Sequence, residues 1–284
     1  MKSGVSSYSY NQAMADGRLT AYEVIDEAAR QGFAGLDIAV FHTDEPVSQA
    51  AGKIRKRAAD AGIKIVNYAV GADILKDGVK ATVGRVRAEL DTAAAMGAAT
   101  FRSDASSGFR EGVKRQVPFM DALPEIAEAY RSIAEYGETL GIRTTIENHG
   151  LYSQDSERVE AIIRTVGHPN FGALLDVGNF ACADEDSVQA TARLLPYAFH
   201  VHAKDFHIKP ACVESPGRGW FRTRSGRHLR GAIIGHGDIP VAACLKMLRD
   251  SGYDGVCAIE FEGIEDCLMA IAEGKQNLDK MLIG

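Results

Sequence analysis

Four short apolar segments in the second half of the chain carry side chains that together could bind a cation. They are RTTIENHG (143–150), GALLDVGN (172–179), AFHVHAKD (198–205) and VCAIEFEG (256–263). Side chains alternate between the two faces of a strand, so the ionisable residues of each segment can share one face, opposite the apolar ones. The candidate ligands on that face are Glu147, Asp176, His200 or His202, and Glu260 or Glu262.

This set of side chains predicts a metal site. A carboxylate in a protein core costs several kcal/mol unless it is paired or ligated, so three carboxylates in one place require a cation. Three carboxylates and one imidazole are mostly hard ligands, which favours Mn²⁺ and also suits Mg²⁺ or Co²⁺, with Zn²⁺ as a further candidate. Each residue taken alone could equally be a salt-bridged or solvated strand end.

The elements that would position these residues follow a regular alternation. Short apolar runs are predicted as strands near 4–8, 35–40, 64–70, 100–102, 143–147, 171–176, 198–204 and 255–261. Helical patterns fill the intervals, near 21–31, 46–61, 78–96, 117–140, 156–166, 187–195, 240–251 and 264–281. Thr20 and Glu23 are spaced as a capping box at the first of these helices.

A glycine recurs where a helix passes into a strand, in QGF, AGI, MGA, LGI and SGY. Such a glycine takes the left-handed conformation just past a helix, which other residues resist. Eight strand–helix units therefore predict a single (β/α)8 TIM barrel domain over residues 1–284. The turn after the first strand lacks the G-x-G-x-x-G of a dinucleotide-binding fold. In a TIM barrel the carboxyl ends of the strands form the active-site face.

Composition narrows the function classes. The chain has 284 residues, 46% hydrophobic and 25% charged, which is typical of a globular protein. Its 32 Lys and Arg against 38 Asp and Glu give a net charge of −6, which argues against a nucleic-acid partner. The five cysteines form no C-x-x-C pair. With no apolar run near ~20 residues and no signal-peptide pattern, we expect a cytoplasmic protein without a membrane partner.

The segments TIENHG, LLDVGN, HVHAKD and GYDGVCAIEFEG, which span 145–262, resemble the sugar phosphate isomerase/epimerase group of xylose-isomerase-like TIM barrels. That group includes ketose 3-epimerases, inosose dehydratase, 3-dehydroshikimate dehydratase and, more remotely, AP endonucleases. The resemblance implies that one divalent metal ion is bound by Glu147, Asp176, His202 and Glu260. Glu262 is the alternative fourth ligand. His200 is interpreted as a hydrogen-bonded core histidine.

The resemblance also implies a mechanism. A sugar isomerase or epimerase of this group moves a proton next to a carbonyl through a metal-stabilised enediolate, and Glu147 and Glu260 would act as base and acid. His149 stands where the dehydratase branch carries a catalytic histidine. The alternative is therefore a metal-dependent lyase or dehydratase, including β-elimination that cleaves a C-linked sugar. In both cases the partner is a small carbohydrate.

Several further residues are candidates for binding the substrate. Asn179 occupies a position where the epimerases usually carry a substrate-binding histidine, and AKDFH replaces their G-E-x-N-R, so this chain departs from a standard ketose 3-epimerase. The substrate-binding candidates are Arg102, Asn179, Lys204, Trp220 and His236. Arg102 and Lys204 could instead pair with nearby acids.

The segment 206–238 is predicted as a long loop rich in arginine. It contains Arg218, Arg222, Arg224, Arg227 and Arg230. Long loops on this barrel face serve as lids or dimer contacts, so this segment could bind substrate or form a homo-oligomer. The GHGD turn at its end predicts conformational roles for Gly235 and Gly237.

Two other function classes are available to this fold, namely DNA repair and non-catalytic binding. A DNA-repair enzyme of this fold needs a cluster of metals and more ligating histidines than the eight in this chain offer. A non-catalytic barrel would have lost its ligands, whereas all four are present. Both classes are therefore disfavoured.

Overall fold

The computed structural model describes residues 1–283 and shows the predicted barrel. In this range, eight parallel strands close in the order β1-β11-β7-β6-β5-β4-β3-β2. The barrel strands are β1 (Lys2–Ser6), β2 (Gly35–Ile38), β3 (Lys64–Val70), β4 (Thr100–Ser103), β5 (Arg143–Glu147), β6 (Phe171–Asp176), β7 (Ala198–Ala203) and β11 (Val256–Ile259). β1 pairs with β11, so the two ends of the chain complete the closure.

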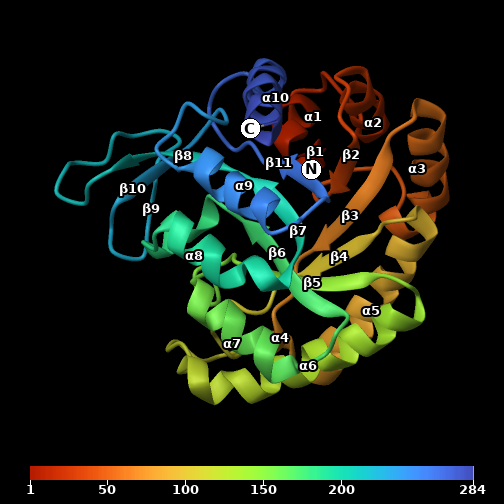
Figure 1. The fold of residues 1–284 in the computed structure, drawn as a ribbon. Helices are drawn as coiled ribbons and strands as arrows, with labels where there is room; N and C mark the ends of the chain where they lie inside the picture. The colour runs from red at the N-terminus through yellow and green to blue at the C-terminus, as the bar shows by residue number, and fades with distance from the viewer. Residues whose placement is uncertain (284) are drawn as a thin grey trace.

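Helices surround this barrel (Figure 1). They are α1 (Asn11–Ala15), α2 (Ala21–Arg30), α3 (Val47–Ala61), α4 (Ile74–Asp77), α5 (Val79–Met96), α6 (Phe119–Thr139), α7 (Ser156–Val166), α8 (Ser187–Leu194), α9 (Val241–Asp250) and α10 (Cys267–Ile283). The short α1 and α4 were not predicted. No helix within residues 1–283 is both long and apolar enough to cross a membrane.

Local signals in the sequence explain where the helices begin and end. The Thr20 hydroxyl accepts from the Glu23 amide while the Glu23 carboxylate accepts from the Thr20 amide, which confirms the capping box. The glycines predicted after helices all have positive φ, between 69° and 89°; they are Gly32, Gly62, Gly97, Gly141 and Gly252. A residue with a Cβ would be strained there, so these positions fix where each helix gives way to a strand.

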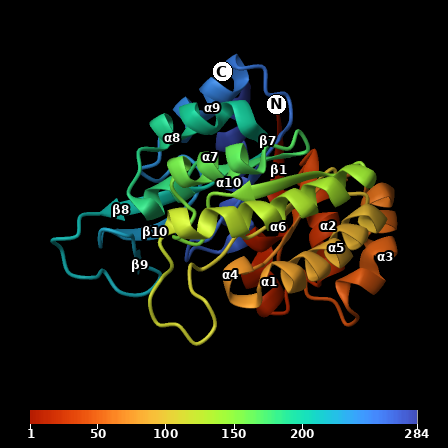
Figure 2. The ribbon, with the colours of Figure 1, turned by 90° about the horizontal axis from the view of Figure 1, so that it is seen from below.

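The predicted loop over 206–238 contains short strands that were not predicted, and the rest of it is irregular. In the described part of the chain it forms an antiparallel sheet in the order β8-β10-β9, from β8 (Asp205–Lys209), β9 (Phe221–Arg222) and β10 (His228–Ala232). The sheet projects from the barrel in both ribbon views (Figures 1 and 2). Lys, Arg and glycine interrupt its hydrophobic alternation, which hid the strands.

The strand β1 begins and ends two residues earlier than predicted. Residues Ser7–Tyr10 form a 3-10 helix, and the Ser6 hydroxyl accepts from the Tyr8 amide at its start. The Tyr8 side chain therefore belongs to the mouth of the barrel and not to a strand.

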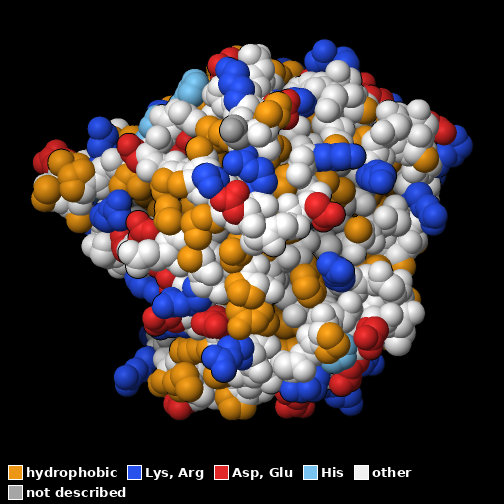
Figure 3. Space-filling model, in the orientation of Figure 1, with side chains coloured by type: hydrophobic (Ala, Val, Ile, Leu, Met, Phe, Trp, Pro, Cys, Tyr) orange, Lys and Arg blue, Asp and Glu red, His pale blue; other side chains and the backbone are white. Residues whose placement is uncertain are grey.

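Basic and acidic side chains are interspersed on the face shown in Figure 3, and neither sign gathers into one field. Hydrophobic side chains gather at the tip of the projecting sheet, at the left of that view. Val213, which lies between β8 and β9, is 40% exposed.

Candidate metal centre

Strand register brings the four predicted ligands together. His202 on β7 lies opposite Asp176 on β6 and opposite Ala258 on β11. Glu147 ends β5, and Glu260 directly follows β11. Each of the four residues offers one ligand atom, and these atoms lie within 4.8 Å of one another in a buried group. Within residues 1–283 this group includes Glu260 and does not include Glu262.

The Asp176 carboxylate is held by backbone groups on one side. Its Oδ1 accepts from the amides of Gly178, at 2.8 Å, and Asn179, at 2.9 Å. The Asn148 side chain bonds the Asp176 backbone at both its amide and its carbonyl, at 2.9 and 2.8 Å. One oxygen of Asp176 is thereby fixed, and the other, Oδ2, points into the group.

His202 is arranged in the same way. Its Nε2 lies 2.7 Å from Asp37 Oδ2. Its Nδ1 faces oxygens of Glu260, Glu147 and Asp176 at 3.6, 3.8 and 4.0 Å, which is too far for hydrogen bonds.

Two buried atoms, which we call the open atoms, are His202 Nδ1 and Asp176 Oδ2. Neither has a hydrogen-bond partner among the residues that the structure describes. Buried polar atoms are normally satisfied, so such atoms need an explanation. A divalent cation would satisfy both, and the donor set of three carboxylates and one imidazole is chemically suited to Mn²⁺, Mg²⁺ or Co²⁺. The residues therefore fit the predicted metal ion.

Lys204 supplies positive charge beside the group. Its Nζ lies 2.7 Å from Glu260 Oε2 and 3.4 Å from Asp176 Oδ2, and it donates to Asn179 Oδ1 at 3.1 Å. Burial, together with the charges of Glu147 and Glu260, raises the pKa of Asp176 to about 6, although Lys204 acts to lower it. Burial would also raise the pKa of Glu260, but Lys204 and His202 lower it well below its ordinary value. Asp176 therefore binds a proton more readily than Glu260 does.

Arg102 pairs with an acid in this structure. Its Nε donates to Glu147 Oε2 at 2.6 Å, and a second guanidinium nitrogen contacts the same oxygen. It also lies 3.2 Å from Asp104. Asp104 in turn lies 3.0 Å from His149 Nδ1. Arg102 therefore orients Glu147, and Asp104 orients His149.

A cavity of about 410 Å³ opens beside this group. Its lining combines predicted and unpredicted residues, namely Tyr8, His149, Gly150, Leu151, Gln154, Asn179, Cys182, Lys204, Gly219, Phe221, Arg222 and Glu262. The projecting sheet thus supplies one wall of the cavity, through β9 and the residues before it.

Three of the five predicted substrate-binding residues do not line this cavity. Among the described residues they are Trp220, His236 and Arg102, the last of which is hydrogen-bonded to Glu147. The Trp220 ring lies 5.7 Å from the Arg230 guanidinium. His236 is exposed in a turn wrapped around Asp205, which accepts from the amides of Gly235 and Gly237. Gly235 has a φ of 87°, and a Cβ on Gly237 would meet Asp205 at 2.2 Å, so both glycines are conformational as predicted.

Comparison with known proteins places this barrel. The model of the family described as "Xylose isomerase-like TIM barrel" matches residues 25–281, which is most of the chain. The chain belongs to this family. The match confirms the fold and the resemblance predicted from the four motifs.

The individual proteins that match this chain are only distantly similar to it. The uncharacterized protein MJ1311 of Methanocaldococcus jannaschii is 28% identical over 142 residues, which are 48% of this chain and 42% of that protein. A probable 3-DHS dehydratase, AsbF, from Bacillus anthracis has a TM-score of 0.73 at 18% identity and covers 98% of this chain and 99% of its own. The L-ribulose 3-epimerase structure has a TM-score of 0.73 at 16% identity and covers 99% and 94%. At these identities the two structures show only that they share the fold of this chain. One of them is named a dehydratase and the other an epimerase.

Several residues of this xylose isomerase-like site were not predicted from the sequence. They are Tyr8, Asp37, Asp104 and Asn148, whereas Phe221 and Arg222 lie in the arginine-rich segment that was predicted to bind substrate. Asp37 did leave a signal, because FAGLDIAV places a carboxylate inside an apolar strand. Asp104 also directly follows the TFRS segment that carries Arg102.

Proposed function

We propose that the protein is a divalent-metal-dependent isomerase or epimerase of a small carbohydrate or a related polyol or keto acid. The observation that carries the proposal is the pair of open atoms within a buried group of four ligand residues, beside a cavity of about 410 Å³. We propose Mn²⁺ as the metal, with Mg²⁺, Co²⁺ and Zn²⁺ as alternatives. Glu147, Asp176, His202 and Glu260 would hold it.

The residues of the chain have separate tasks in this proposal. A bound divalent cation would polarise the substrate carbonyl and make the neighbouring C–H more acidic. Glu147, held on one oxygen by Arg102, removes the proton from that carbon. Glu260, which is paired with Lys204 and ionised in this structure, first takes up a proton from solvent. It then returns that proton to the carbon from the other side, which inverts the carbon. Asn179 and Lys204 line the cavity and bind substrate oxygens.

A lyase is the second candidate, and the position of His149 favours it. The ring lines the same cavity, and its Nδ1 lies 3.0 Å from Asp104. A histidine held this way can protonate a β-hydroxyl group, so that abstraction by Glu147 ends in loss of water and not in inversion.

The test follows deuterium from solvent into a panel of keto-sugars and keto-inositols with the Mn²⁺-loaded protein. Deuterium at the carbon next to the carbonyl, without loss of water, supports the isomerase. An α,β-unsaturated product supports the lyase. If the metal-loaded protein gives neither across the panel, the proposed function is wrong.

We also propose that residues 1–284 form one domain, although Gly284 lies outside the described residues. The projecting sheet is our candidate for a homo-oligomer contact, because hydrophobic side chains gather at its tip (Figure 3).

A further inference from the structure

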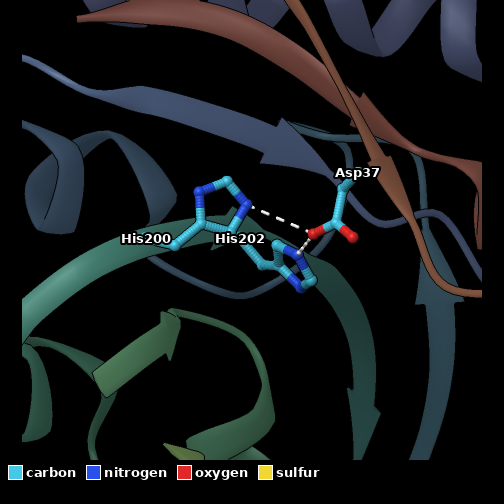
Figure 4. A group of neighbouring side chains, drawn as sticks. All are labelled: Asp37, His200 and His202. Atoms are coloured by element: carbon cyan, nitrogen blue, oxygen red, sulfur yellow. Dashed lines mark hydrogen bonds and ion pairs between the residues drawn. The ribbon is translucent and has the colours of Figure 1, made fainter. Parts of the chain in front are cut away.

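A buried carboxylate on the far side of the barrel interior contacts the metal centre through His202. Asp37 lies on β2 and is fully buried. Its Oδ2 lies 2.7 Å from His202 Nε2 and 3.2 Å from His200 Nε2 (Figure 4). The same oxygen accepts from the Asn67 side-chain amide at 3.0 Å. Three nitrogen atoms therefore converge on one oxygen atom, and the Asn67 amide nitrogen among them is a donor.

Asp37, His200 and His202 also satisfy the geometry of a metal-binding group. Two observations favour hydrogen bonds over a second ion. The N–O distances of 2.7 and 3.2 Å are those of direct hydrogen bonds. The third partner of the oxygen is the Asn67 amide nitrogen, which donates and does not ligate.

The protonation pattern of His202 follows from this arrangement. Asp37 Oδ2 accepts from the Asn67 amide nitrogen, and both imidazole Nε2 atoms approach the same oxygen at hydrogen-bond distance. Because this oxygen acts as the acceptor, the shared hydrogen lies on Nε2 of His202. Nδ1, one of the open atoms, is then the ring nitrogen that faces the other three ligands.

The acceptor is itself held in place. The Thr100 hydroxyl donates to Asn67 Oδ1 at 2.8 Å, which orients the Asn67 amide so that its nitrogen faces Asp37. A chain of hydrogen bonds thus runs from β4 through β3 and β2 to His202 on β7. The first half of the barrel supplies none of the four ligands, and it supports the centre through this chain.

We infer that Asp37 is a positioning residue of the metal centre, which fixes the Nε2–H form of His202 and thereby presents Nδ1 as a metal ligand. The inference rests on the metal centre of the proposed function. A carboxylate behind a ligating histidine also increases the basicity of the ring, and removal of such a partner typically costs about 10- to 100-fold in metal affinity.

The test titrates Mn²⁺ and Co²⁺ into the full chain by calorimetry, without substrate. Asp37→Asn keeps the shape of the side chain and removes its charge. We expect its affinity for both ions to fall about 10- to 100-fold. The matched control is His200→Gln, which removes the other histidine on the same oxygen and should bind the ions nearly as the wild type does.

A second measurement needs no variant at Asp37. ¹⁵N NMR of the histidine rings in the Mg²⁺-loaded wild type should show His202 with hydrogen on Nε2 and a bare Nδ1, with the signal assigned by its loss in His202→Gln. Hydrogen on Nδ1 would overturn the inference even if Asp37→Asn does not fold.

The outcomes separate the two proposals. Wild-type affinity in Asp37→Asn overturns the positioning role and leaves the proposed function standing. A wild-type protein that binds no divalent cation overturns both.

Discussion

At the metal centre, the atoms that already have bonds determine what each residue can do. Asp176 uses Oδ1 for two backbone amides, and His202 uses Nε2 for Asp37. Only the open atoms remain: His202 Nδ1 faces Glu147 and Glu260, and Asp176 Oδ2 lies 3.4 Å from Lys204 Nζ and 4.0 Å from His202 Nδ1. The residue types suggest a cation, whereas the hydrogen bonds behind them determine which atoms would bind it.

The first prediction concerns the two glutamates with proposed proton-transfer roles. Glu147→Gln and Glu260→Gln should each lower kcat by about 10²- to 10⁴-fold, because an amide cannot exchange the proton. Deuterium exchange into the substrate measures the loss, and circular dichroism checks the fold. Glu262→Gln is the control, since Glu262 lines the cavity outside the ligand group. Full activity in either of the first two variants would remove that residue from the mechanism.

Strand alternation predicted the residues that end neighbouring strands, including Glu147 and Asp176. It could not predict Asp37, because the contact with His202 crosses the interior from β2 to β7 and depends on how the barrel closes. Trp220 was predicted to bind substrate as part of the arginine-rich segment. Its neighbours Phe221 and Arg222 line the cavity instead, and this depends on a small sheet that the sequence did not reveal.

At the scale of elements, the barrel was predictable because each unit carries its own signals. The glycines predicted after helices have positive φ, and the barrel strands lie in short segments that contain apolar residues. The sheet β8-β10-β9 is held differently. Arg224 pairs with Asp155, and the Thr223 hydroxyl donates to Asp184, so contacts with the barrel rim stabilise it. Such long-range partners are invisible in local sequence.

The second prediction tests this sheet as a wall of the cavity. Lys209 pairs with His228, so residues 210–227 can be replaced by a two-residue Asn-Gly turn. The variant loses Phe221 and Arg222, and we expect KM to rise roughly tenfold, a loss of about 1.4 kcal/mol. Its Mn²⁺ affinity should stay unchanged because the four ligands remain. The exposed Arg218→Ala serves as the control, and an unaltered KM in the shortened protein would contradict the role of the sheet.

The third prediction concerns the start of α4. Asp73 caps this helix at the Lys76 amide and accepts from the Ser106 hydroxyl at 2.6 Å. Asp73→Ala should lower the free energy of unfolding by about 1–2 kcal/mol at pH 7, as expected for a lost cap. Urea unfolding measures it, with the exposed Lys76→Ala as control.

The pH dependence of that loss has a defined sign. Partial burial acts to raise the pKa of Asp73, but hydrogen bonds from Ser106 and Ser107 lower it below its ordinary 3.8. A carboxyl group whose pKa is lower in the folded than in the unfolded protein stabilises the fold at pH values above the unfolded pKa. This contribution to the free energy of unfolding is lost as the pH falls through the folded pKa. The difference between wild type and Asp73→Ala should therefore shrink below about pH 4. A constant difference from pH 3 to 7 would count against this account.

For the whole molecule, the metal ion should act as a stabilising ligand. Binding at 100 times Kd adds about 2.7 kcal/mol to the free energy of unfolding. We therefore expect Mn²⁺ to raise the Tm of the EDTA-treated protein by several degrees, as measured by differential scanning calorimetry. Asp176→Asn should show almost no rise. An equal rise in both proteins would indicate binding elsewhere.

The closure of the barrel by β1 and β11 also bears on synthesis. Glu260 is the last of the four ligands along the chain and stands just past the strand that completes the ring. The four ligands can therefore come together only after the ribosome has released the chain as far as Glu260. Loading with the proposed metal ion is possible only after that point.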